Sequence, residues 1–419
     1  MLLKKISIIE IFLKILIKII PTIDRDTLIS IGKKNKSICI VEEAYEFVVQ
    51  EPEQELAKKR FKDSCGPRKV DCFFGVFLND VRIIGSHGLV VTRYGQVITE
   101  PIFRYLKEIL RVTIYDLGLI GFFKEYFFAV FPFFDFKNFF LKEGALLNSR
   151  GTRKAILNDH VYSSPVFGHW MTEQLPQLRA IEEVIKKYNL TSCKLIINKL
   201  PEEWQIESLR LMGHDKDKII CMPKNGLRVG QLIISSLRNT GSKPNRMELD
   251  PKARQWVAKR LQSNYNHINS NNISFKKNIC LFRLDVPSKR IKNIDNVRKI
   301  IKLNNFIEIK IGKDDLFDSA KDFLYAEKFL YTLGGGVTRI MFSKNLKEII
   351  EIYSCDQDKI DAFFLLATEL GIKYKCVAAA KLPLSVSNKI EKNIFYYENE
   401  INEWYLPEED LVAVLNDKN

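Results

Sequence analysis

Apolar and polar residues alternate along this chain in blocks that predict an α/β protein. In the first half, short apolar runs that suit buried strands are separated by a stretch with helical periodicity. The strands are expected at 193–197, 218–221 and 232–236, and the helix at 204–212. Strands and helices of these lengths in alternation favour a parallel sheet with helices on both faces.

The second half repeats the alternation. The turn-rich segment 239–245 separates the halves, so we expect the first domain to end there. An amphipathic helix over 250–263 follows, and then a strand that ends at Arg283. Further along, the pattern predicts helices at 296–301 and 315–327 and strands at 306–311, 328–332 and 347–353.

Residues 1–20 are apolar nearly throughout, yet one helical face is polar. Its residues are Ser7, Glu10, Lys14 and Lys18, and Pro21 ends the helix. The lysines interrupt the run of about 20 apolar residues that a transmembrane span needs. The pattern favours either a basic amphipathic helix in a membrane interface or a helix packed on the protein's own surface. No small-residue cleavage site follows, which argues against a cleaved signal peptide.

Two runs of β-branched residues punctuated by glycine, 75–85 and 88–98, predict a β-meander. A segment crowded with phenylalanine follows at 121–140, where Pro132 prevents one long helix. We interpret these rings as core packing between the meander and the first sheet; the alternative is a hairpin that dips into a membrane.

These patterns divide the chain into four segments. They are an amphipathic helix (1–21), an α/β domain that includes the meander (22–240), a second α/β domain (241–380) and a C-terminal tail (381–419).

The composition describes an ordinary folded protein with a basic surface. The 419 residues carry a net charge of +14, which fits nucleotide diphosphates, an anionic membrane surface or nucleic acid as partners. The basic residues are interspersed with acidic ones and form no basic-aromatic stripe, which argues against nucleic acid. The 8 cysteines are scattered without a Cys-x-x-Cys pair. We therefore expect reduced thiols in a cytosolic setting, not a zinc ribbon or a disulfide framework.

The stretch 158–178 carries the residues best suited to chemistry. With the apolar run 155–157 before it, the stretch predicts a strand, a turn and then a helix that starts near Trp170. In an α/β sheet such a turn lies at the carboxyl edge, where ligands bind. His169 and Glu173 share one face of the helix, and an imidazole beside a carboxylate can move a proton near neutral pH. The alternative is a helix end with a capping histidine and a solvated glutamate.

A basic loop in the second half is a candidate for binding phosphates. Arg283 ends a strand, and Lys289 and Arg290 follow in the loop, which places cations where a diphosphate could bind. The alternative is a solvated basic loop.

A second candidate is a glycine-rich turn between a strand and a helix. Gly334, Gly335 and Gly336, followed by Thr338, would let backbone amides and a helix N-terminus approach a phosphate closely. Glu351, on the next strand, is expected near the sheet edge, where its carboxylate could accept ribose or sugar hydroxyls. The alternative is an ordinary tight turn between strand and helix.

These motifs, in this order, resemble glycosyltransferase family 61 and the related capsular-polysaccharide biosynthesis proteins. The signature is His-Trp at 169–170, then Glu173, Leu-Pro and a further Leu, with the basic loop, the glycine-rich turn and a strand ending in Glu351 downstream. The chain departs from the family pattern at Leu333, where members usually have histidine, and at Arg339, where they have asparagine.

The resemblance implies a GT-B-like enzyme with two Rossmann-like domains facing a cleft. The first domain would hold the acceptor and the second the nucleotide sugar. Carried over by position, His169 and Glu173 lie in the catalytic region, and Asp159 or His160 could substitute as the base. The positions on the donor side are Arg283, Lys289, Arg290, Gly334, Gly335, Gly336, Thr338 and Glu351.

The expected function is transfer of a sugar from a nucleotide-sugar donor to a glycan or lipid-linked acceptor, with inversion. No Asp-x-Asp motif ends a convincing strand, so we expect neither a metal nor another cofactor. The expected location is cytoplasmic, with peripheral membrane contact if the first helix binds lipid. The alternatives are a non-catalytic membrane-associated binding protein and another nucleotide-dependent α/β enzyme.

Overall fold

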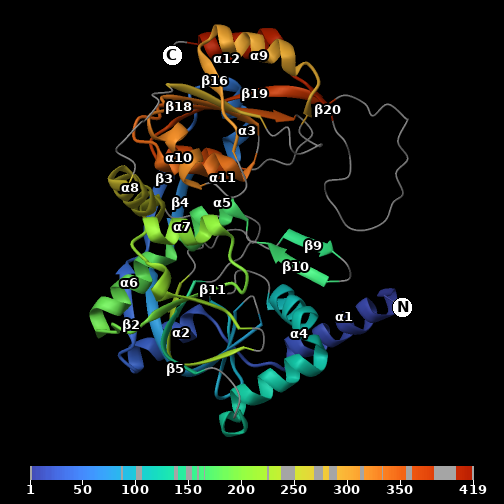
Figure 1. Ribbon diagram of the computed structural model, residues 1–419, viewed down its shortest axis with the longest axis vertical. Coiled ribbons are helices and arrows are strands. Elements are labelled where there is room, and N and C mark those ends of the chain that lie inside the picture. The colour runs from blue at the N-terminus through green and yellow to red at the C-terminus, as the bar shows by residue number, and fades with distance from the viewer. Residues whose placement is uncertain are drawn as a thin grey trace. The chain divides into compact units, whose positions relative to one another are not determined.

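The computed structural model describes most of the chain (Figure 1). The described residues are 2–85, 88–100, 106–135, 140–147, 153–157, 160–164, 166–223, 226–236, 251–268, 277–282, 290–311, 316–332, 334–354, 361–381 and 403–417. The chain forms two compact units: unit 1 comprises Met1–Glu46 and Lys69–Val257, and unit 2 comprises Phe47–Arg68 and Ala258–Asn419. Both units combine a sheet with helices, which confirms the predicted α/β class.

Unit 1 is built on a mixed sheet in which the strands run in the order β1-β7-β6-β5-β13-β8-β11-β12, with β2 also paired to β5. The strands are β1 (Thr22–Ile23), β2 (Ile38–Glu42), β5 (Phe73–Ile84), β6 (Leu89–Thr92), β7 (Val97–Ile98), β8 (Phe140–Leu146), β11 (Lys194–Ile197), β12 (Ile219–Cys221) and β13 (Leu227–Ser235). Strands β13, β8, β11 and β12 are parallel, and β13 pairs antiparallel with β5. The meander of β5, β6 and β7 therefore continues the parallel strands in one sheet and is not a separate layer.

The helices of unit 1 flank this sheet. They are α1 (Leu2–Ile19), α2 (Arg25–Lys34), α4 (Leu106–Val130), α5 (Phe167–His169), α6 (Gln177–Tyr188) and α7 (Glu203–Leu211), with the short turns η2 (Pro132–Phe134), η3 (Trp170–Gln174) and η4 (Lys216–Lys218). Helix α6 is amphipathic, and its buried residues Leu178, Ile181 and Val184 lie on the side that contacts β2, β5 and β13. Burial of this apolar stripe holds the helix on the sheet.

Helix α1 packs on the protein's own surface. Its residues Leu13 and Leu16, with Ile20 directly after the helix, join one buried cluster with Leu110 and Phe122 of α4. The second of the two interpretations of residues 1–20 therefore holds for the buried side of this helix, and the cluster does not decide what its exposed side contacts. Among the described residues, no helix is both long and apolar enough to cross a membrane.

Helix α4 bends at Gly118, where φ of 71° and ψ of 164° interrupt the helix. Glycine adopts this backbone conformation readily because it has no Cβ. The predicted core packing of the phenylalanine-rich segment is only partly correct. Phe122 is buried, whereas Phe127 and Phe133 are exposed.

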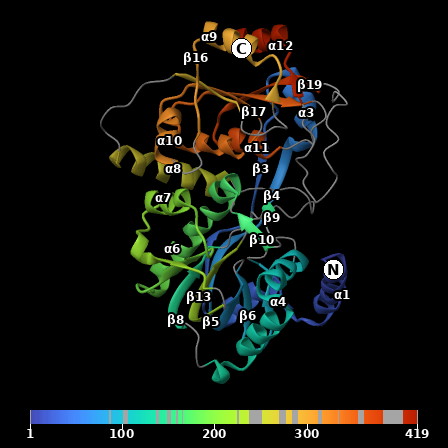
Figure 2. The same cartoon turned by 45° about the vertical axis from the view of Figure 1, so that its right-hand side comes forward.

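Unit 2 contains a largely parallel sheet in the order β15-β20-β19-β18-β17-β14-β16. The strands are β14 (Asn278–Leu281), β15 (Arg290–Ile291), β16 (Phe306–Glu308), β17 (Lys328–Thr332), β18 (Glu348–Ser354), β19 (Lys373–Lys381) and β20 (Glu403–Tyr405). The helices are α3 (Glu55–Phe61), α9 (Ile294–Leu303), α10 (Leu316–Leu324), α11 (Ala362–Glu369) and α12 (Glu408–Asn416), with the short turns η1 (Lys62–Ser64) and η6 (Gly335–Phe342). Helices α9 and α12 cover one face of the sheet, and α10 and α11 cover the other (Figures 1 and 2).

The order of the strands in unit 2 reverses at β14. From β14 the chain passes through β15 and α9 to β16 on one side of β14, and then through α10 to β17 on the other side. In open α/β sheets, ligands bind outside the carboxyl ends of the strands at such a switch point.

The boundaries between the two units fall within β3 (Tyr45–Val49), β4 (Gly66–Val70) and α8 (Pro251–Ile268).

An early segment of the chain, 47–68, belongs to unit 2. Phe61 of α3 stacks on Phe364 of α11 with ring centroids 4.6 Å apart. The Gln54 side chain imitates a neighbouring strand: its Nε2 donates to the carbonyl of Cys376 at 2.9 Å, and the amide of Cys376 donates to its Oε1 at 2.7 Å. These contacts join residues that are more distant in sequence than any local pattern can reveal.

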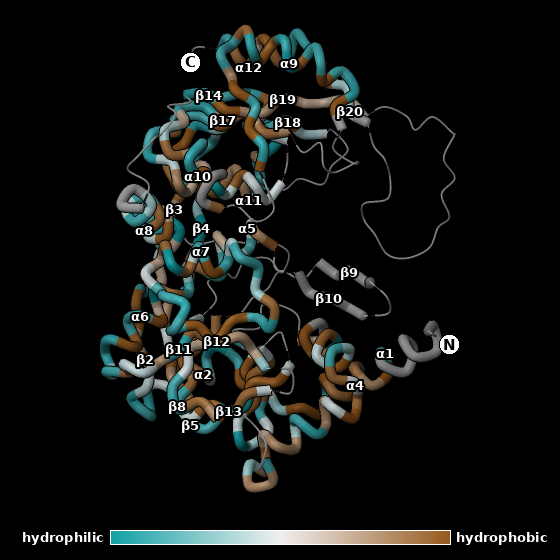
Figure 3. Tube along the Cα trace, in the orientation of Figure 1, coloured by the Kyte–Doolittle hydropathy of each residue, from teal (hydrophilic) through white to brown (hydrophobic). Residues whose placement is uncertain are grey.

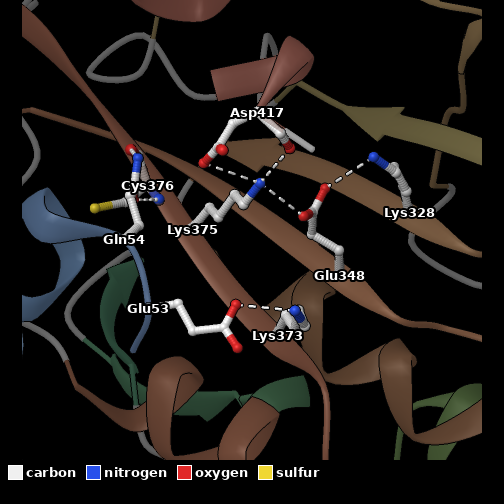
Figure 4. A network of polar contacts seen from close by, with 8 residues as sticks. All are labelled: Glu53, Gln54, Lys328, Glu348, Lys373, Lys375, Cys376 and Asp417. Atoms are coloured by element: carbon white, nitrogen blue, oxygen red, sulfur yellow. Dashed lines mark hydrogen bonds and ion pairs between the residues drawn. The ribbon is translucent and has the colours of Figure 1, made fainter. Parts of the chain in front are cut away.

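Figure 4 shows the polar network beside this segment. Lys375 of β19 is buried, and its ammonium group lies 3.0 Å from Glu348 and 3.3 Å from Asp417. Lys373 pairs with Glu53 at 2.9 Å. The network ties the end of α12 and the early segment to the central strands of unit 2.

Candidate active site

The helical stretch that carries His169 follows strand β8 of unit 1. Between them, β9 (Arg153–Leu157) and β10 (His160–Ser164) form a separate antiparallel hairpin. The prediction that 155–157 is the sheet strand before the helix is therefore wrong, because a hairpin is inserted after the true sheet strand. Strand β8 lies between β11 and β13, so the strand order reverses there too, and α5 begins the crossover from the carboxyl end of β8.

Residues Trp170–Gln174 form a π-helical turn. The amide of Leu175 donates to the carbonyl of Trp170 at 3.0 Å, which spans five residues instead of four. Pro176 explains the widening, because its ring clashes with the carbonyl four residues earlier and it has no amide hydrogen to donate. The side-chain amide of Gln177 donates to the carbonyl of Glu173 at 3.2 Å. Such turns are rare and often lie at functional sites.

Trp170 anchors this turn to α7. Its indole Nε1 donates to Ser208 Oγ at 2.8 Å, and its ring meets that of Trp204 edge to face at 6.1 Å. Phe167 contacts the same Trp204 ring at 5.1 Å. Buried aromatic rings of this size fix the backbone of the neighbouring residue, which is His169.

The structure brings the imidazole of His169 and the carboxylate of Glu173 together. Nδ1 of His169 lies 2.7 Å from Oε1 of Glu173. The side chain of His169 is 27% exposed, whereas that of Glu173 is only 4% exposed. If Nδ1 carries the hydrogen in this bond, the lone pair is on Nε2. Within the described part of the chain, Nε2 has no hydrogen-bond partner, so it is open to an external group.

Two glutamines beside this pair were not predicted. Gln174 and Gln177 are buried, and Nε2 of Gln174 and Oε1 of Gln177 have no hydrogen-bond partner among the described residues. Buried polar atoms are normally paired, so these two are candidates for contact with a bound polar molecule. The signal in the sequence was a cluster of polar residues, 172–174, inside a helix start that is otherwise apolar.

The structure gives no side-chain geometry for Asp159 and His160, the two alternatives to His169 as the base. Asp159 lies outside the described residues. His160 is the first residue of β10, opposite Leu157 of β9. Neither is brought into a described contact with His169.

The basic loop of unit 2 is described only at its ends. Arg283 and Lys289 lie outside the described residues, and Arg290 opens β15, opposite Glu403 of β20. Strand β14 ends at Leu281, so the segment that contains Arg283 starts at the carboxyl end of β14.

The glycine-rich turn follows β17, the parallel neighbour of β14. Gly334 precedes the 3₁₀ turn η6, and a Cβ at Gly336 would lie 3.2 Å from Leu281 and 3.4 Å from Ile311. A side chain at 336 would therefore require the side chains of Leu281 and Ile311 to give way by a few tenths of an ångström. Thr338 is buried, and its Oγ1 donates to the carbonyl of Gly335 at 2.8 Å, so this hydroxyl holds the turn together.

Glu351 does not lie where a sugar-binding carboxylate would have to be. It is in the middle of β18, which runs between β17 and β19, and it is completely buried. Arg60 of α3 lies 3.3 Å from its Oε1, and the hydroxyl of Tyr374 donates to its Oε2. The expectation of an exposed edge fails because local sequence does not show which strands are central. The carboxylate is enclosed by an arginine and a tyrosine.

Residues 167–350 match the family Glycosyltransferase 61. The match confirms the resemblance indicated by the motifs and supports a transferase that uses a sugar donor and an acceptor. No curated protein matches the chain significantly.

The segment similar to Glycosyltransferase 61 includes His169, Glu173 and the glycine-rich turn, and it stops before Glu351. It therefore includes both the helical stretch that carries His169 in unit 1 and the strands at the switch point of unit 2.

Metal centres and reactive thiols are two further kinds of site that could carry chemistry. No group of three or more His, Cys, Asp or Glu that could hold a metal ion occurs among them. Burial raises the pKa of Cys193 to about 12 and the pKa of Cys376 to about 12. These thiols therefore stay protonated at neutral pH and are poor nucleophiles.

Proposed function

We propose that this protein transfers a sugar from a nucleotide sugar to a hydroxyl group of a glycan or lipid-linked acceptor, with inversion at the anomeric carbon. The observation that carries the proposal is the contact between His169 and Glu173 inside the segment that matches Glycosyltransferase 61. An exposed imidazole oriented by a buried carboxylate is the arrangement that a general base needs.

His169 takes the role of the base. Its Nε2 removes the proton from the acceptor hydroxyl while the acceptor oxygen attacks the anomeric carbon on the face opposite the leaving group. The bond from that carbon to the nucleoside diphosphate breaks, and its electrons leave with the diphosphate. Glu173 keeps its bond to Nδ1 and stabilises the positive charge on the ring. Direct displacement of this kind inverts the configuration.

Unit 2 is the proposed donor side, in the manner of GT-B enzymes. The segment with Arg283 and the turn at Gly334 follow the adjacent parallel strands β14 and β17 at the switch point. Backbone amides of the turn, together with Arg283 and Lys289, would bind the diphosphate and stabilise its charge as it leaves. Cations of the chain could then serve instead of a metal ion, so we propose that the reaction needs none.

Two of the predicted donor residues receive structural roles in this proposal. Thr338 holds the glycine turn through its bond to Gly335. Glu351 neutralises Arg60 inside unit 2 and does not contact the donor.

The test is a panel of nucleotide sugars, each incubated with the purified full chain and an acceptor mixture. We expect release of nucleoside diphosphate with one donor and a rise in melting temperature with that donor alone. Binding of a nucleotide sugar without any release, over the whole panel and acceptor mixture, would favour a non-catalytic binding protein. Neither binding nor release would contradict the proposal.

A further inference from the structure

Helices α1 and α4 present an apolar surface that the core of unit 1 does not use. On α1, Ile11, Ile15 and Ile19 are four residues apart and all are exposed. The opposite side of the same helix, with Leu13 and Leu16, is buried against α4. Helix α1 therefore has two apolar sides and buries one.

The surface continues over α4 and η2, where aromatic rings predominate. The exposed residues are Ile120, Phe123, Phe127, Phe131, Phe133 and Phe134. The first four recur at spacings of three and four, which places them on one side of the helix after the bend. We call these residues and the three isoleucines of α1 the aromatic face.

Ring contacts join α1 to α4 and connect the rings at the end of α4 with one another. Phe12 of α1 meets Phe123 of α4 with centroids 6.1 Å apart. Phe127 lies 4.9 Å from Phe131 and 5.7 Å from Phe134. Figures 1 and 2, two views that differ by a turn of 45°, both show α1 beside α4, and Figure 3 shows α4 as hydrophobic over much of its length. Single exposed apolar residues are ordinary, but a contiguous patch marks an interaction surface.

Charges beside the aromatic face indicate its partner. Lys14 and Lys18 are exposed next to the isoleucines of α1, and Lys124 is exposed between the rings of α4. The carboxylate of Glu10 is paired with Arg111 at 2.6 Å. Asp116 is exposed, but it lies before the bend at Gly118. The net charge of the chain, +14, has the same sign as these lysines.

We propose that the aromatic face docks unit 1 on an anionic lipid surface, with α1 and α4 lying in the interface and not crossing it. Aromatic and branched apolar side chains beside lysines are typical of helices that lie in the headgroup region. A second copy of the chain is a poorer occupant, because a symmetric contact would bring the lysines of both copies together. The inference does not depend on the proposed activity.

The experiment is flotation of the full chain with vesicles of phosphatidylcholine alone or mixed with phosphatidylglycerol. We expect flotation with the mixed vesicles, less with phosphatidylcholine, and a decrease at high salt because surface charge is screened. The variant Phe133→Ser/Phe134→Ser should weaken binding on the order of tenfold or more for each ring. The variant Lys14→Glu/Lys18→Glu should weaken binding to the mixed vesicles roughly 25-fold or more.

Matched controls lie elsewhere on unit 1. Leu200 is exposed like Phe133, and Lys33 and Lys34 are exposed like Lys14. Leu200→Ser and Lys33→Glu/Lys34→Glu should float like the wild type. The proposal is overturned if the wild type does not float, or if the control variants lose as much binding as the test variants. It is also overturned if the wild type does not bind vesicles and light scattering shows that it is a dimer which the Phe133→Ser/Phe134→Ser variant converts into a monomer.

Discussion

Unit 1 contains two pairs of histidine and glutamate with almost the same distance between their side chains but different chemical capabilities. His169 and Glu173 are 2.7 Å apart, and His214 and Glu182 are 2.9 Å apart. In the first pair the histidine is 27% exposed and the carboxylate 4%; in the second the histidine is 11% exposed and the carboxylate 28%. The histidine is thus the more exposed partner in the first pair, and the glutamate is the more exposed partner in the second.

The bonded nitrogen differs as well. His169 uses Nδ1 and leaves Nε2 open, whereas His214 uses Nε2 in its bond to Glu182. A general base needs an exposed imidazole held by a buried acceptor, and only the first arrangement supplies it. The second pair ties α6 to the residues after α7 and is best regarded as structural. Distance alone therefore does not identify a catalytic pair.

The largest expected difference is between the two histidines. His169→Ala should lower kcat about 10²- to 10⁴-fold, because the proton of the acceptor hydroxyl loses its base. His214→Ala should leave kcat unchanged and cost about 1 kcal/mol of stability through its lost hydrogen bond. Turnover and urea denaturation of both variants check this. Equal losses of kcat in both would remove the distinction between the pairs.

A second buried carboxylate sharpens the comparison. Glu351 is enclosed with Arg60, so Glu351→Ala leaves an unpaired buried charge and should cost about 3–5 kcal/mol of unfolding free energy. Glu182→Ala, which removes a more exposed carboxylate, should cost about 1 kcal/mol or less. Urea denaturation measures both. A stable Glu351→Ala protein with a raised KM for the donor would return Glu351 to the donor site.

Replacing Glu173 by glutamine isolates the role of its charge. The amide oxygen can still accept the bond from Nδ1, but it no longer stabilises the imidazolium ring. We expect Glu173→Gln to lower kcat less than His169→Ala does, with little change in the KM for the acceptor. Steady-state kinetics test this, with Glu182→Gln as the matched variant. Wild-type kcat in Glu173→Gln would show that orientation alone suffices.

The glycine turn offers a smaller effect in unit 2. Gly336→Ala places a methyl group 3.2 Å from the end of the Leu281 side chain, so either that side chain or the turn must move slightly, at a cost of about 1 kcal/mol. We expect the KM for the nucleotide sugar to rise while the KM for the acceptor stays the same. A rise confined to the KM for the acceptor would show that the nucleotide sugar does not bind at this turn.

The smallest expected effect comes from removal of divalent metal. If the basic segment after β14 receives the diphosphate, turnover should be the same after treatment with a chelator as before it. Complete loss that is restored by added Mg²⁺ or Mn²⁺ would contradict the metal-independent reaction.

Local pattern was enough to predict features that depend on near neighbours. The strand at 328–332 is β17, and the four-residue spacing of His169 and Glu173 brings them into contact. Both features depend on the periodicity within a single strand or helix, which the sequence shows directly.

Features that depend on distant residues could not be predicted. The contact of Arg60 with Glu351 and that of Gln54 with Cys376 join the early segment to unit 2 across most of the chain. The apolar run 155–157 resembles a sheet strand, so local sequence could not show that β9 pairs with β10 and, among the described strands, with no strand of the sheet. The widened turn before Pro176 depended on a clash that a regular helical repeat does not show.

The most direct test of the central claim is rescue of His169→Ala by added imidazole. The account predicts that nucleoside diphosphate release by this variant rises with imidazole concentration, because the free ring can enter the space left by the side chain and take the proton. His214→Ala should not respond to imidazole. Wild-type release by His169→Ala without imidazole would contradict the assignment of His169 as the base.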